Sequence, residues 1–209
     1  MASGYNCKIM SIKNKQPHIV ILAGPNGAGK STTAPVLLRD TFAVDEFVNA
    51  DAIAQGLSAF APENVALEAG KIMLRRVREL AQKRSDFAFE TTLASRSFAP
   101  WLKSLEETGY RVHLLFLTLP NVQAARERVA IRVKLGGHAI PNDIIERRFK
   151  AGLRNLFQLY IPIVTSWKIL DNSIPGRPLD VAEGNRYAHA TVTNSTWYDK
   201  LKAEYAHGS

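Results

Sequence analysis

Short apolar runs, many rich in β-branched or aromatic residues, alternate along this chain with segments whose apolar positions recur every three or four residues. The short runs predict five buried strands, at residues 19–22, 47–51, 86–91, 111–119 and 167–170. The periodic segments predict helices at residues 31–39, 51–57, 62–83, 100–108, 122–135, 144–160 and 197–206. Because strands and helices alternate, we expect an α/β, three-layer fold, a five-stranded parallel sheet with helices on both faces. Residues 179–193 are turn-rich and compatible with a short hairpin.

The first apolar run leads directly into GPNGAGKST at residues 24–32, which fits the phosphate-loop pattern G-x-x-x-x-G-K-[ST] without a mismatch. The expected nucleotide-binding residues are Gly24, Pro25, Asn26, Gly27, Ala28, Gly29, Lys30, Ser31 and Thr32. The glycines allow backbone N–H groups to approach phosphate oxygens, Lys30 can bind the β- and γ-phosphates, and the Ser31 hydroxyl can bind Mg²⁺. The sequence therefore predicts a site for a nucleoside triphosphate with Mg²⁺.

Composition sets limits on this picture. With 209 residues, 46% of them hydrophobic, we expect one domain over residues 18–209 behind a polar N-terminal arm at residues 1–17. No apolar run approaches the roughly 20 residues that span a membrane, so no membrane partner is expected. Cys7 is the only cysteine, which excludes an internal disulfide and suits a reducing compartment. We therefore expect a cytoplasmic protein.

The net charge of +8 is concentrated in residues 121–160, which hold eight basic and three acidic residues. Such a run usually marks a solvated helical face, but downstream of a phosphate loop it also suits a lid that clamps phosphates. Arg128 and Arg132 are four residues apart on one helix face, and Arg147 and Arg148 lie early in the next helix. We expect these arginines to form a lid at about residues 121–160.

The segment Gly136-Gly137-His138 between the two lid helices is a candidate hinge that would let them close over the nucleotide, with His138 as a hydrogen-bonding lid residue. Solvated surface arginines remain the alternative for Arg126 and Arg154. The basic residues are not interleaved with aromatic residues as in grooves that bind single strands, so no nucleic-acid partner is expected.

Two of the predicted strands end on carboxylates, Asp51 and Glu90. In parallel sheets the ligand lies beyond the carboxyl ends of the strands, so both side chains would face the nucleotide. We expect Asp51 to be the general base that deprotonates an acceptor hydroxyl, with a helix N-cap as its alternative role. For Glu90 the alternatives are a ligand of metal-bound water, an acceptor for a substrate hydroxyl, or a plain strand-end carboxylate. Phosphoryl transfer to a small acceptor is favoured over mechanical ATP hydrolysis, because no apolar run ends in an Asp-Glu pair.

The stretches GPNGAGKST, FVNADAIAQGL, FAFETTLASRSF and RVAIRVKLGGHAIPNDIIERRF together resemble the zeta toxin family of P-loop kinases, over about residues 17–173. The resemblance implies a kinase that uses ATP or GTP with Mg²⁺ to phosphorylate the 3′-hydroxyl of the sugar in UDP-N-acetylglucosamine. It implies Asp51 as the catalytic base, Arg132 on the γ-phosphate, and Glu90 with Thr92 as substrate-binding residues. A small-molecule acceptor such as a sugar nucleotide and a separate antitoxin are the partners it implies.

This sequence departs from the family at the lid. Where the toxins carry a second arginine before the lid proline, this chain has Gly136-Gly137-His138, so Arg147 or Arg148 must supply it. We take Arg148 as the catalytic candidate and Arg147 as the substrate-binding one. A glutamate expected on the long helix has no clear counterpart, since Leu74 falls near that place and Glu68 is one alternative.

Two other functions stay open on the residues alone. One is a nucleotide-switched ATPase or binding module, in which ATP controls contacts of the basic segment with RNA or protein. The other is a nucleoside or polynucleotide kinase, since substrate pockets vary on a constant phosphate site.

Overall fold

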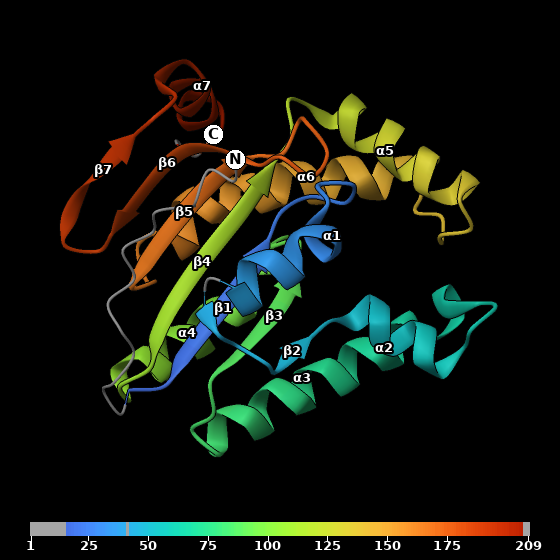
Figure 1. Cartoon of the computed structure of the whole chain (residues 1–209), viewed down its shortest axis with the longest axis horizontal. Coiled ribbons are helices and arrows are strands. Elements are labelled where there is room, and N and C mark those ends of the chain that lie inside the picture. Colours follow the sequence, from blue (N-terminus) through green and yellow to red (C-terminus); the bar gives the residue numbers. More distant parts are fainter. Residues whose placement is uncertain (1–15, 41, 207–209) are drawn as a thin grey trace.

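Within residues 16–40 and 42–206, the part of the chain that the computed structural model describes, seven strands form one sheet (Figure 1). The strand order is β2-β3-β1-β4-β5-β6-β7. The strands are β1 (His18–Ala23), β2 (Phe47–Val48), β3 (Phe87–Thr91), β4 (Arg111–Thr118), β5 (Ser166–Asp171), β6 (Leu179–Asn185) and β7 (Ala188–Val192). The first five are parallel, as expected, and β6 and β7 extend the sheet as an antiparallel hairpin. The expected N-terminal arm lies, except for its last two residues, outside the described part.

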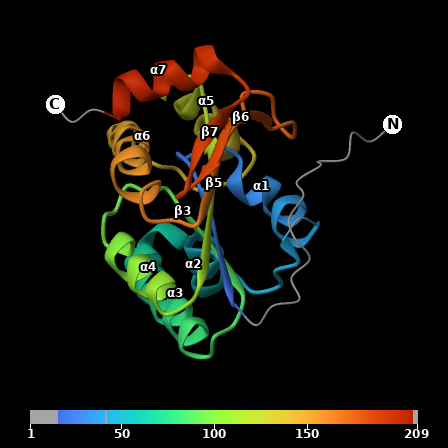
Figure 2. The ribbon, with the colours of Figure 1, turned by 90° about the vertical axis from the view of Figure 1, so that its left-hand side faces the viewer.

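Helices cover both faces of the sheet, with α1 on one side and α3, α4 and α6 on the other (Figure 2). The α-helices are α1 (Lys30–Ala34), α2 (Ala50–Leu57), α3 (Ala66–Gln82), α4 (Phe98–Glu107), α5 (Val122–Lys134), α6 (Asn142–Asn155) and α7 (Ser195–Tyr205). Short turns of other helix types extend three of them, at Pro35–Asp40, Pro62–Val65 and Leu156–Tyr160. No helix of the described residues is long and apolar enough to cross a membrane.

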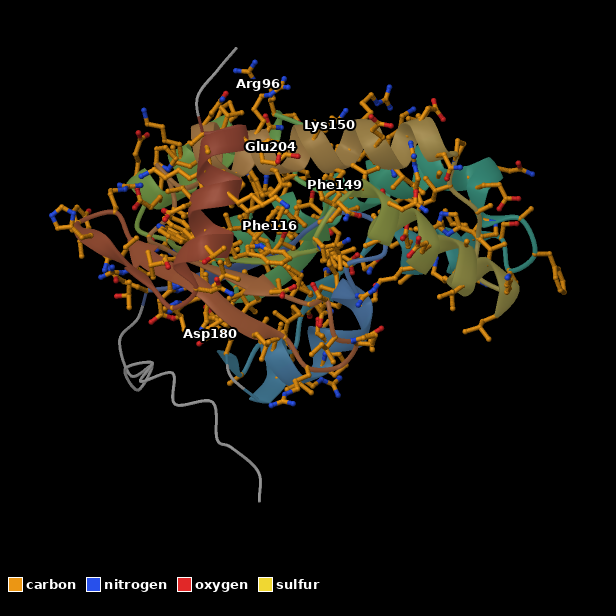
Figure 3. All side chains as sticks on the ribbon, turned by 90° about the horizontal axis from the view of Figure 1, so that it is seen from above. Arg96, Phe116, Phe149, Lys150, Asp180 and Glu204 are labelled. Carbon is orange, nitrogen blue, oxygen red and sulfur yellow. The ribbon has the colours of Figure 1, made fainter. Side chains whose placement is uncertain are left out.

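The core lies where β1, β3 and β4 run side by side beneath the helices. Residues 19–23 of β1 are fully buried, as expected of a central strand covered on both faces. Phe149 of α6 and Phe116 of β4 point into the layer between helix and sheet, whereas Lys150 and Arg96 lie at the outer surface (Figure 3). The register pairs Leu22 with Glu90, so the loops that follow β1 and β3 both leave the sheet at the carboxyl end of the parallel strands.

The strand predicted at residues 47–51 is wrong in its extent. Strand β2 ends at Val48, and Asp51 lies in the first turn of α2. The cause is Asn49, whose side-chain oxygen accepts hydrogen bonds from the backbone N–H groups of Asp51 and Ala52 and so starts the helix early. Asp51 therefore belongs to the helix that follows β2 and is not the N-cap residue.

Candidate active site

The phosphate loop is held against the end of β4 and the start of α5. Gly24, Gly27 and Gly29 all have positive φ, of 143°, 80° and 80°. A Cβ atom on Gly24 would collide with the carbonyl oxygen of Leu117, and one on Gly27 would lie 2.8 Å from the carbonyl oxygen of Ala125. Both positions therefore require glycine for backbone conformation and for space.

Lys30 lies inside this loop with only 6% of its surface exposed. Its Nζ donates to the carbonyl oxygen of Pro25 at 3.0 Å and lies 3.5 Å from Glu90 Oε1. Burial lowers the pKa of Lys30, the carboxylates of Glu90 and Asp51 oppose that effect, and Arg132 reinforces it. The charges of both predicted carboxylates and of one lid arginine therefore act on the same ammonium group.

Glu90 lies between the phosphate loop and β2. Its Oε2 accepts hydrogen bonds from Ser31 Oγ at 2.8 Å and from Asn49 Nδ2 at 2.7 Å. This places a carboxylate beside the hydroxyl predicted to bind Mg²⁺, and the oxygen donors of Ser31 and Glu90 are of the type that Mg²⁺ prefers. Since the described residues contain no cluster of three His, Cys, Asp or Glu side chains, an ion here would complete its coordination with phosphate oxygens and water.

The base candidate Asp51 is exposed, in the first turn of α2. Its backbone N–H is bound to Asn49 Oδ1 at 2.7 Å, while its carboxylate has no hydrogen-bond partner among residues 16–40 and 42–206. In Figure 1, α2 and α5 lie on opposite sides of α1. The Asp51 carboxylate is thus free of protein partners in the described chain, on the side of α1 where α2 lies.

Two of the three arginines of α5, Arg128 and Arg132, are held by backbone carbonyl groups. Arg128 Nη2 donates to Ser173 at 2.6 Å, and Arg132 Nη2 donates to His138 at 3.1 Å. The expected hinge folds back on Arg132, because the N–H of Gly137 donates to the Arg132 carbonyl oxygen at 2.9 Å. A Cβ atom on Gly137 would lie 2.6 Å from Arg132 Cγ. The backbone of this segment therefore positions Arg132, and His138 contributes through its carbonyl oxygen.

The remaining predicted residues are not in direct contact with the phosphate loop. Arg147 is exposed and Arg148 is half-buried, both on α6, and neither side chain has a hydrogen bond or ion pair within the described ranges. Thr92 follows β3, and its carbonyl oxygen lies against Gly152 of α6. Arg126 is partly buried and pairs with Glu146 at 2.6 Å, so it joins α5 to α6 and is not a freely solvated surface arginine.

Two asparagines belong to the site but were not among the predicted residues. Asn49 could have been found from its place before a predicted helix, where asparagine is a common cap. Asn172, which is 1% exposed, follows β5 and donates from Nδ2 to the carbonyl oxygen of Ala28 at 2.7 Å. A Cβ atom on Gly29 would lie 2.7 Å from the same nitrogen. Asn172 braces the phosphate loop from 144 residues away, so no local signal could reveal it.

Comparison with known proteins supports this picture at the level of family and fold. The profile of the family described as Zeta toxin matches residues 5–163. A protein of Haemophilus influenzae described as uncharacterized is 29% identical over 142 residues, which cover 68% of this chain and 97% of that protein. The resemblance seen in the sequence is thereby confirmed.

Several solved structures share the fold. A chain of the AvrRxo1-ORF1:AvrRxo1-ORF2 complex with sulphate ions matches with a TM-score of 0.72 and 21% identity. The match covers 93% of this chain and 65% of that chain, so this protein spans about two thirds of its length. The same complex has been solved with ATP, and a chain of it matches with a TM-score of 0.69.

A structure of the PezAT chromosomal toxin-antitoxin system of Streptococcus pneumoniae matches with a TM-score of 0.60 and 16% identity, over 98% of this chain and 83% of that chain. These identities establish a common fold. The family profile, which covers most of the chain, establishes the family as well. This protein belongs to the Zeta toxin family and has the α/β fold of P-loop kinases.

Proposed function

We propose that this protein is an ATP-dependent kinase that transfers the γ-phosphate to a hydroxyl group of a small molecule. The observation that supports it is the contact of Lys30, Ser31 and Glu90 at the phosphate loop, with Asp51 on the adjoining helix. A phosphate-binding half and a carboxylate without a hydrogen-bond partner in the described chain, at the same edge of the sheet, are what transfer to a hydroxyl needs.

The donor half consists of residues that bind and orient the triphosphate. The loop N–H groups and Lys30 bind the phosphates, and Ser31 with Glu90 would hold Mg²⁺, which neutralises charge that develops on phosphate oxygens. Among the alternatives for Glu90, its contacts with Lys30 and Ser31 support this metal-side role over binding of the substrate.

In the transfer step the acceptor oxygen forms a bond to the γ-phosphorus, and the bond from that phosphorus to the bridging oxygen breaks. Its electron pair leaves with the nucleoside diphosphate, and the acceptor's proton passes to Asp51. Arg132 and Arg148 stabilise the charge on the transferred group. Thr92 and Arg147 are the acceptor-side candidates.

For the acceptor we propose a UDP-N-acetylsugar, on the strength of the family to which the chain belongs. PezAT is a toxin-antitoxin system, and we propose that this chain likewise binds a separate antitoxin. A binding module for RNA or protein remains the second candidate, because Arg147 and Arg148 lack ion-pair partners within residues 16–40 and 42–206.

The decisive experiment is transfer of labelled γ-phosphate from ATP into a metabolite extract, followed by identification of the labelled product. We expect label in a phosphorylated sugar nucleotide, and no label with Lys30→Ala. Label in nucleic acid would identify a polynucleotide kinase instead. Label in inorganic phosphate alone, with RNA affinity that falls steeply as salt is added, would favour the binding module.

A further inference from the structure

The side chain of Asn49 makes hydrogen bonds in two directions. Its Oδ1 accepts from the backbone N–H groups of Asp51 at 2.7 Å and Ala52 at 3.1 Å. Its Nδ2 donates to Glu90 Oε2 at 2.7 Å and lies 3.5 Å from Ser31 Oγ. Asn49 is only 9% exposed, so these groups have little access to water that could replace the bonds.

This set of partners requires an amide. The two N–H groups at the start of α2 fix which atom of the side chain is the oxygen, and the nitrogen must then point at the carboxylate of Glu90. A carboxylate at position 49 could cap the helix but would repel Glu90. A serine could cap it but would leave Glu90 Oε2 without this donor.

From this geometry we infer that Asn49 is a positioning residue for nucleotide-bound Mg²⁺, acting through Glu90. The start of α2 anchors the amide oxygen, and the anchored amide nitrogen holds the Glu90 carboxylate beside Ser31. The start of the helix that carries Asp51 and the carboxylate on the metal side are thereby joined into one unit. This inference rests on the proposed function, since it assumes that Ser31 and Glu90 bind a metal–nucleotide complex.

The competing role for Asn49, a plain helix cap, has a control in the same chain at an exposed position. Asn194 caps α7, and its Oδ1 accepts from the backbone N–H of Trp197 at 3.0 Å. Its backbone is extended, as at Asn49. Helix α7 packs against α6 and β6, at the other side of the sheet from β2. A substitution at Asn194 therefore removes a cap without touching the metal side.

The test compares Asn49→Ser, Asn194→Ser and the wild type in binding of a fluorescent ATP analogue as the Mg²⁺ concentration is varied. A hydrogen bond to a charged group is worth about tenfold or more in an equilibrium constant. We expect Asn49→Ser to need about tenfold more Mg²⁺ for half-maximal binding, and its binding in EDTA to be unchanged. Asn194→Ser should match the wild type in both. If Asn49→Ser does not fold, Asn49→Thr takes its place, because threonine can also cap the helix and likewise lacks the amide donor to Glu90, so the same shift is expected.

A double-mutant cycle tests the route through Glu90. Glu90→Gln should also raise the Mg²⁺ requirement, and Asn49→Ser should add little to it in the double variant. An Mg²⁺ requirement equal to that of the wild type in Asn49→Ser, or fully additive effects in the cycle, overturns the inference. The binding measurement needs no acceptor. A wild type that binds the analogue but transfers no phosphate therefore refutes the proposed function. The Mg²⁺ requirement of Asn49→Ser still decides whether Asn49 positions the metal side.

Discussion

The charged side chains of this site differ in how they are held. Lys30 is buried, and the carboxylate of Glu90 offsets the cost of burying its ammonium group. Arg132 is oriented by the backbone at Gly137 and His138. Asp51, by contrast, has a carboxylate that binds no other described residue. These differences predict distinct effects for substitutions that look equally small.

Asp51→Asn should lower the rate of phosphate transfer by about 10²- to 10⁴-fold, because the amide cannot accept the acceptor's proton. The affinity for ATP should change little, since Asp51 is not part of the phosphate loop. Transfer rates and binding of an ATP analogue, measured side by side, check this. A variant that retains the wild-type transfer rate would disprove the assignment of Asp51 as base.

Gly137→Ala should lower kcat by about 10²-fold, the order of loss that a displaced catalytic group produces. The new Cβ atom would lie 2.6 Å from Arg132 Cγ, so the arginine must move. Steady-state kinetics with a thermal melt separate this effect from unfolding. Unchanged kcat would mean that Arg132 does not act in the transfer step.

At the scale of secondary-structure elements, α6 and the turn that extends it are in close contact with the loop that follows β3. Asn155 Nδ2 donates to the carbonyl oxygen of Leu93 at 2.7 Å. The hydroxyl of Tyr160 donates to the carbonyl oxygen of Ser95 at 2.8 Å. Leu93 is fully buried with φ of 55°, a conformation that costs energy in a leucine. The helix that carries Arg148 is thus joined to the loop that carries Thr92, so the two cannot shift independently.

Two Gly→Ala substitutions in helices should therefore have opposite signs. Gly70→Ala in α3 should stabilise the protein by about 1 kcal/mol, because its Cβ atom meets open space and helix propensity improves. Gly152→Ala in α6 should destabilise it by about 1–3 kcal/mol, because its Cβ atom would collide with the carbonyl oxygen of Thr92. Urea denaturation measures both. Equal effects would show that α6 is not tightly packed on the loop.

At the scale of the whole molecule, two histidines meet at the end of the sheet opposite the site. The rings of His18 in β1 and His113 in β4 are stacked, with His18 Nδ1 2.9 Å from His113 Nε2. Burial, then the charges of His18 and Arg111, lower the pKa of His113 to about 4. Burial also lowers the pKa of His18, with Asp86 opposing it. The folded protein therefore holds this pair neutral at pH values where the unfolded chain binds protons.

Stability should accordingly fall as the pH is lowered from about 6.5 towards 4, because the unfolded state then takes up more protons than the folded state. Each such histidine contributes a slope of up to about 1.4 kcal/mol per pH unit. Urea denaturation at several pH values checks this, and His113→Gln should flatten the slope. A slope that does not change in this variant would exclude His113 as its source.

Much of the fold was predictable because its signals are local. Strand β4 and helix α5 were predicted to within one residue at each end, because continuous apolar runs and an Asn cap mark their bounds. The end of β2 was not, because a side-chain cap at Asn49 overrides the strand pattern. The hairpin β6–β7 was compatible with the turn-rich residues, but its pairing with β5 needed the sheet itself.

What the sequence determined by itself is the phosphate loop, because its function depends on consecutive residues that bind one group. Tertiary structure alone decided which atoms of distant side chains meet there. Glu90 meets Ser31 across 59 residues, and Asn172 meets Ala28 across 144. Such contacts depend on strand order and register, which no short pattern encodes. The phosphate loop and the strand-end carboxylate Glu90 could therefore be predicted from the sequence, whereas the supports at Asn49 and Asn172 became visible only in the contacts of the folded chain.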